Sequence, residues 1–300
     1  ILTGSLVASN LILPWHLIAI SLCNGILLSF DIPCRQAIVP NPVPRQHLVN
    51  AISLQSMLGT GSAVIGPSLL PLLIQIWGIS GVFFSVGFAY IFTTIMFARL
   101  KSQEPTGGHD HRSPWFDLIS GLIYLRNQPI LIALIAMGVV SGLFASSLPT
   151  LFPVFATENL GGGIGIYGGL LLSNGIGGLI GAAVLANFVR VRDSSLVQVL
   201  AGIGLGIGFV SLAGVAWVSI AILVIGIVGA CSVGFGTINN TLMQSLLEDA
   251  YRGRVMSIHQ LGWGASAIGG LVVGFLAETI NVPFTFALCG SVTAISTAAI

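Results

Sequence analysis

Apolar stretches of about 20 residues, the length that crosses a bilayer as an α-helix, follow one another along the whole chain. Lipid offers no partner to backbone groups, so such stretches must be helices or barrel strands. They are too long and too uniformly apolar for barrel strands, which alternate. We therefore predict a remnant span at 1–13 and nine nearly complete helices near 15–39, 47–76, 81–99, 129–155, 165–189, 195–214, 217–245, 253–277 and 282–300.

Positive charge marks every second break between these stretches. All ten Lys and Arg residues fall within 35–45, 99–126, 190–192 and 252–254, and the other breaks have none. Because cytoplasmic loops of membrane proteins concentrate Lys and Arg, this alternation predicts that the four basic patches lie on the cytoplasmic side.

Composition agrees with a membrane protein, since only 6% of the residues are charged and 55% are hydrophobic. A net charge of +1 argues against nucleic acid as a partner. The four cysteines are scattered, mostly within spans, and form no CxxC pair, which indicates neither a zinc site nor a disulfide framework. We expect a lipid bilayer around a monomer, with no metal and no cofactor.

The longest polar stretch divides the chain into a first bundle at 1–99, a central cytoplasmic loop at 100–128 and a second bundle at 129–300. Within the loop, Trp115, Ile119, Leu122 and Ile123 recur at helical spacing beside Asp117 and Arg126. This pattern predicts an amphipathic helix, either on the inner membrane face or packed as a linker.

A weak internal repeat relates the two bundles. With an offset of 204 residues, 44–53 aligns with 248–257 and Ser62 with Ser266. Parallel repeats of this kind are typical of transporters. The chain opens inside an apolar run at Ile1 and stops inside another at Ile300. We therefore expect a fragment whose first bundle lacks about two and a half helices, by comparison with the second bundle.

Four polar residues share one face of the predicted helix near 217–245. Thr237, Asn240, Thr241 and Gln244 follow the spacing i, i+3, i+4, i+7. Such a face either lines a cavity, because polar groups facing lipid are costly, or bonds to a neighbouring helix. Further candidates for a substrate cavity are Asn24, Ser147 and Asn174.

Asp31 lies one turn before Arg35, near the cytoplasmic end of its predicted helix. It is either a proton or gating carboxylate or, as we favour, an ion-pair partner of Arg35 or another basic residue. No acidic residue lies deep in a predicted span, so a proton-coupling carboxylate would belong to the segment missing before Ile1. We expect His259 to be a packing residue rather than a ligand.

Glycines recur at GxxxG spacing in the pairs Gly177/Gly181, Gly202/Gly206, Gly204/Gly208 and Gly270/Gly274. They permit close helix approach, either for sliding or for static packing. The GxGxxG at 163–168 follows no strand, and the HxH at 109–111 lies in a polar loop, so we assign neither a nucleotide nor a metal. The chain contains no GxSxG, HExxH or Walker sequence, and we do not expect an enzyme.

Several loops resemble the major facilitator superfamily. The run from Asp31 to Pro40, followed by Val43-Pro-Arg and Asn50-Ala-Ile-Ser-Leu, looks like the inner loop after its fourth helix. The run from Arg252 to Ser257 is similar to the equivalent loop after the tenth helix. Gly66-Pro67 resembles the antiporter motif, although Ser62 and Leu69 replace its flanking glycines. The resemblance extends over all 300 residues and is closest to the secretion-type branch that includes the enterobactin exporter.

This resemblance implies an all-α polytopic fold of two six-helix bundles, the first one truncated, around a cavity open to each side in turn. It implies a secondary transporter of the inner membrane that exports a small siderophore- or drug-like molecule by proton antiport. The alternatives are an importer or lipid transporter of the same superfamily, or a non-transporting receptor or scaffold. The resemblance also implies cytoplasmic latch residues, namely Asp31, Arg35, Arg45, Arg190, Asp193, Arg252 and Arg254.

The topology makes a first prediction. In a variant without native cysteines, a cysteine at position 101 should react with an impermeant thiol reagent only after the cells are opened. A cysteine at position 158 should react on intact cells, because its break carries no positive charge. Reaction of both positions from one side would refute the proposed topology.

Overall fold

The computed structural model describes residues 1–38, 48–99, 114–188, 194–248 and 251–299, and all regular elements in these ranges are helices. The chain divides into two compact units, Ile1–His109 and Asp110–Ile300. Within the described ranges, seven helical segments are long and apolar enough to cross a membrane. The prediction of an all-α polytopic membrane protein is thereby confirmed. The domain boundaries predicted near 99 and 128 stay predictions.

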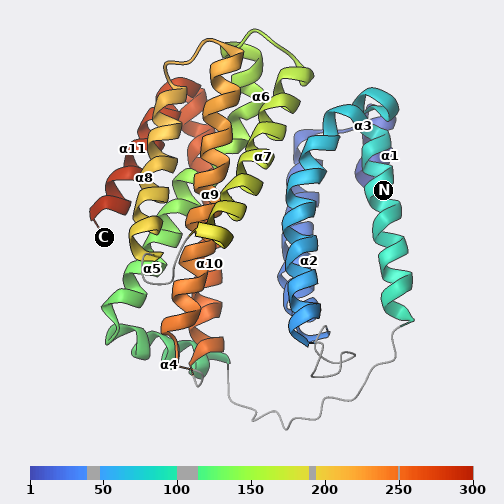
Figure 1. Ribbon diagram of the computed structural model, residues 1–300. Coiled ribbons are helices and arrows are strands. Elements are labelled where there is room, and N and C mark those ends of the chain that lie inside the picture. The colour runs from blue at the N-terminus through green and yellow to red at the C-terminus, as the bar shows by residue number, and fades with distance from the viewer. Residues whose placement is uncertain (39–47, 100–113, 189–193, 249–250, 300) are drawn as a thin grey trace. The chain divides into compact units, whose positions relative to one another are not determined.

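The first unit contains α1 (Leu2–Ala8), α2 (Pro14–Ile38) and α3 (Leu48–Ala98) (Figure 1). Helix α1 packs on α3, where Gly4 lies against Phe83 and Phe84. Gly78 interrupts α3 with φ 69° and ψ 175°. Only glycine adopts such a backbone conformation readily, so Gly78 makes the break expected between the spans at 47–76 and 81–99.

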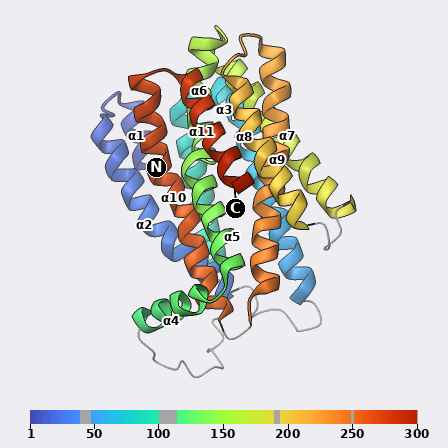
Figure 2. The ribbon, with the colours of Figure 1, turned by 90° about the vertical axis from the view of Figure 1, so that its left-hand side faces the viewer.

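The second unit is a bundle of long helices with one irregular crossing (Figures 1 and 2). Its regular α-helices are α4 (Pro114–Arg126), α5 (Pro129–Val140), α7 (Ile164–Phe188), α8 (Ser194–Leu212), α9 (Val218–Leu246), α10 (Arg252–Thr279) and α11 (Val282–Ala299). The irregular segment continues α5 through η2 (Ser141–Ala145), η3 (Leu148–Leu151), the short α6 (Phe152–Val154) and η4 (Phe155–Asn159).

Glycines bring the long helices into backbone contact. A Cβ atom on Gly177 or Gly181 of α7 would overlap the backbone of Gly226 or Ala230 on α9. The glycines of the two GxxxG pairs on α8 face two different neighbouring helices. A Cβ on Gly206 would meet Gly290 of α11, whereas Gly204 and Gly208 face side chains of α9. Helix α8 therefore packs between α9 and α11.

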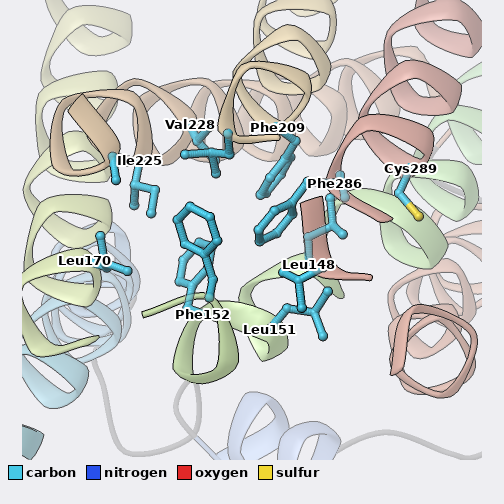
Figure 3. Close-up of a cluster of buried hydrophobic side chains, with 14 of the residues drawn as sticks. Leu148, Leu151, Phe152, Leu170, Phe209, Ile225, Val228, Phe286 and Cys289 are labelled. Atoms are coloured by element: carbon cyan, nitrogen blue, oxygen red, sulfur yellow. The ribbon is translucent and has the colours of Figure 1, made fainter. Parts of the chain in front are cut away.

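An aromatic cluster fills the end of this unit away from α4 (Figures 1 and 3). Phe286 of α11 stacks on Phe209 of α8, with ring centroids 6.0 Å apart. Its ring also meets Phe155 of η4 edge-on at 5.3 Å. The irregular segment therefore contributes its aromatic residues to the core, and this end of the bundle is closely packed.

Helix α4 packs on the opposite end of the bundle. Gly121 lies against Ile258 and Arg254 of α10, and Leu125 is buried. Tyr124 stacks on Tyr251, with centroids 4.3 Å apart. The outward face of α4 exposes Ile119, Leu122 and Ile123. The helix expected from the sequence thus joins the second unit through Gly121, Tyr124 and Leu125, while Ile119, Leu122 and Ile123 stay uncovered.

The contact between α7 and α9 makes a second prediction. Gly177→Ala should lower the midpoint of thermal unfolding of the purified protein, by a destabilisation of about 1–3 kcal/mol, because a methyl group has no room beside Gly226. Gly165→Ala is the matched control on the same helix, since nothing lies near its Cβ position. That change should leave the midpoint equal or slightly higher. Equal midpoints for Gly177→Ala and the unaltered protein would contradict the close contact.

Candidate functional site

Helix α9 has a polar exposed face in its second half. Thr237, Asn240, Thr241 and Gln244 are all exposed, while Phe235, Ile238, Asn239 and Met243 are buried on its other side. The Gln244 amide donates to Asn240 Oδ1 at 3.0 Å, and the Thr241 hydroxyl donates to the Thr237 carbonyl at 2.8 Å. The four residues thus form a continuous polar strip, called here the α9 stripe. Its role in lining a cavity stays a prediction.

The other predicted cavity residues lie apart from this stripe. Asn24 is exposed on α2 in the first unit. Ser147 is buried, and its hydroxyl lies within hydrogen-bond distance of the carbonyls of Gly142 (3.1 Å) and Ser266 (3.0 Å). Asn174 of α7 lies against Gly229 of α9, within the helix contact. The structure therefore places Ser147 and Asn174 between helices of the second unit.

Of the predicted latch residues, Arg254 is the one whose side chain is described. Its guanidinium carbon lies 5.9 Å from the centre of the Tyr251 ring, beside α4. For Asp31, Arg35 and Arg252 the structure describes the helix but not the side chains. Arg45, Arg190 and Asp193 lie outside the described residues. The latch therefore stays a prediction for all seven residues.

Three buried polar side chains, two of which the sequence analysis did not single out, converge on α5. Gln198 of α8, Asn239 of α9 and His259 of α10 are each 2% exposed. The Gln198 amide donates to the sulfur of Met137 at 3.6 Å, and the Asn239 amide donates to the Leu134 carbonyl at 3.0 Å. Asn239 Oδ1 in turn lies 2.7 Å from His259 Nε2.

A signal for Asn239 was present in the sequence. The spacing that places Thr237, Asn240, Thr241 and Gln244 on one face places Asn239 outside that face. A polar side chain off the stripe is expected to turn toward a neighbouring helix, because polar groups facing lipid are costly. Gln198 gave no comparable signal, since its buried face could be identified only from the packing of α8.

The crossing segment that starts with α5 is irregular over its second half. Its π-helical turns η2 and η4 flank the short η3 and α6, which contain Pro149 and Pro153. Proline lacks the amide proton that would continue the helix, so the hydrogen-bond pattern changes there. Ser147 and Gly269 hold this segment against α10. Irregular crossings of this kind are frequent near functional sites of membrane proteins.

No group of three or more His, Cys, Asp or Glu side chains that could hold a metal ion occurs in the described ranges. Among the described residues of the second unit, the buried polar side chains are amides, hydroxyls and the imidazole of His259. Such groups can bind an organic molecule by hydrogen bonds and can exchange a proton at the imidazole.

Comparison with known proteins gives consistent matches. The whole chain, residues 1–300, matches the family model described as transmembrane secretion effector. The chain is 24% identical to the staphyloferrin A transporter of Staphylococcus aureus over 274 residues, which cover 89% of this chain and 67% of that protein. It is 22% identical to macrolide efflux protein A of Streptococcus pyogenes over 294 residues, which cover 96% and 72%. The multidrug efflux pump Tap of Mycolicibacterium fortuitum is 27% identical over 171 residues, covering 56% and 41%.

Proposed function

The chain belongs to the transmembrane secretion effector family of major facilitator transporters, and we propose that it exports a small organic molecule in exchange for protons. It is a multi-pass protein of the bacterial plasma membrane and a transporter rather than an enzyme. The direction of transport, the coupling ion and the class of substrate are our proposals. Two relatives whose names denote efflux, acting on macrolides and on multiple drugs, support export.

The observation that carries the proposal is the α9 stripe. Much of the exposed surface of the long helices is apolar, as expected where helices meet lipid. Four exposed polar residues on one helix face would be unfavourable in hydrocarbon. We infer that the stripe faces an aqueous substrate pathway, where its amides and hydroxyls bind polar groups of the transported molecule. Asn24 on α2 of the first unit is a further proposed substrate-binding residue.

The latch residues complete the proposed mechanism. Arg254 packs on Tyr251 at the end of the unit where α4 lies. We propose that the latch arginines Arg35, Arg45, Arg190, Arg252 and Arg254 form charge pairs at the cytoplasmic entrance, with Asp31 and Asp193 as the acidic members of the set. Breaking and reforming these pairs would open and close that entrance.

Transport itself is the third prediction. Proteoliposomes that contain the purified protein should accumulate radiolabelled macrolide or staphyloferrin A when a pH gradient, acidic inside, is imposed. An ionophore that collapses the gradient should abolish accumulation, and a trapped pH dye should report outward proton movement. Accumulation only with the opposite gradient would indicate import, and absence of flux for every substrate tested would favour a receptor or scaffold.

The α9 stripe makes a fourth prediction. Asn240→Leu or Gln244→Leu should change the relative transport rates of different substrates about fivefold or more, because each change removes hydrogen bonds of roughly 1 kcal/mol or more to polar groups of the substrate. Ser232→Leu is the matched control, since Ser232 is exposed on another face of α9. A substrate profile that neither stripe variant alters would assign these side chains to helix packing.

A further inference from the structure

His259 is held in one tautomer by its neighbours. The Asn239 amide nitrogen donates to the Leu134 carbonyl at 3.0 Å, which turns Asn239 Oδ1 toward His259 Nε2 at 2.7 Å. Because this oxygen can only accept, Nε2 must carry the hydrogen. In the neutral imidazole the lone pair therefore lies on Nδ1.

That lone pair has no partner. His259 is only 2% exposed, and its buried Nδ1 makes no hydrogen bond. Nearly all buried polar atoms in proteins are paired, so an exception needs a physical explanation. An unoccupied ring nitrogen is a base, and the simplest group that it can bind is a proton.

The helices leave little space around the imidazole. A Cβ on Gly138 of α5 would lie 3.8 Å from both Asn239 Oδ1 and His259 Nε2. One turn further along α10, the Gly262 carbonyl would be 2.6 Å from a Cβ on Gly142. Gly138 of α5 thus lies beside the imidazole, and Gly142 of η2 meets the backbone of α10 one turn further along.

Few ionisable groups share these helices. Helix α5 has none, and neighbouring α9 and α11 each carry only one cysteine. Along α10 the nearest charges are those of Arg252 and Arg254, and the next is Glu278, nineteen positions after His259. Helix α4, beside the start of α10, contributes Asp117, Tyr124 and Arg126. Apart from Glu278 and Asp117, these elements provide no carboxylate to neutralise a charged imidazole.

We propose that His259 Nδ1 is a proton-binding site of this transporter and carries a proton exchanged during transport. The inference rests on the proposed proton antiport. Proton binding would place a charged N–H group where the described packing offers no acceptor. It therefore favours a conformation in which Nδ1 meets water, whereas release of the proton favours the closed packing described here.

The same helix connects this proton to the substrate. Asn239 binds His259, and the adjacent Asn240 belongs to the exposed α9 stripe. A change at His259 that moves the α9 backbone at Asn239 would also move Asn240, because one helix backbone carries both. Proton binding on one side of α9 is thereby coupled to substrate binding on the other.

The test compares the unaltered protein with His259→Gln. A glutamine amide can still donate to Asn239 Oδ1 but cannot take up a proton. In proteoliposomes with an imposed pH gradient, the variant should accumulate radiolabelled macrolide or staphyloferrin A at least tenfold less and lose the coupled proton signal. His16→Asn is the control, since it keeps an acceptor for the Leu13 amide that His16 Nδ1 binds at 3.1 Å. It should match the unaltered protein.

A second readout needs neither substrate nor variant function. In nitrogen-15 histidine-labelled protein in nanodiscs, the His259 Nδ1 resonance should change to its protonated form as the sample is acidified across the pH range in which the protein transports. The resonance is assigned by its loss in His259→Gln. Coupled transport that survives in the variant would overturn the role of His259 while leaving antiport intact. Absence of pH-driven flux in the unaltered protein would contradict the proposed proton antiport. An Nδ1 that stays unprotonated throughout this range would contradict the proton site at His259.

Discussion

Contact between helix backbones at glycine is the constraint on which the second unit depends. Lipid tails are as apolar as leucine side chains, so burial of apolar surface drives helix association weakly in a bilayer. Helices α7 and α9 approach until Gly177 meets Gly226, and α8 and α11 do so at Gly206 and Gly290. At these distances dispersion contacts and backbone dipoles act along the whole crossing. The other contacts of the bundle are arranged around these close approaches.

The two ends of this bundle differ in chemistry. The end near the irregular segment is filled by phenylalanines around Phe286, and these rings give it a rigid apolar core (Figure 3). The half nearer α4 contains the buried amides and imidazole that meet α5 and the exposed α9 stripe. Groups that can bind a polar molecule or a proton are therefore concentrated in one half, while the other half provides a fixed support.

The adjacent residues Asn239 and Asn240 connect these two polar regions. The first is buried between helices and the second is exposed, so α9 carries polar groups on opposite sides at the same height. In a helix without an internal kink, one side cannot move without the other. The proton site at His259 and the substrate site at the α9 stripe would then lie on opposite sides of one helix. Movement of α9 would change both sites together and so couple the two binding events.

The amino-acid sequence was enough to predict the membrane class, the positions of the helices and the membership of the α9 stripe, because span length and helical periodicity are local properties. It also located the helix break near Gly78, although the left-handed backbone there came from the structure. The structure then showed what each helix face meets. It assigned Gly206 to α11 and Gly208 to α9, placed Asn174 and Ser147 between helices, and paired Asn239 with His259. Periodicity defines which residues share a face, but the partner of that face depends on how distant segments pack.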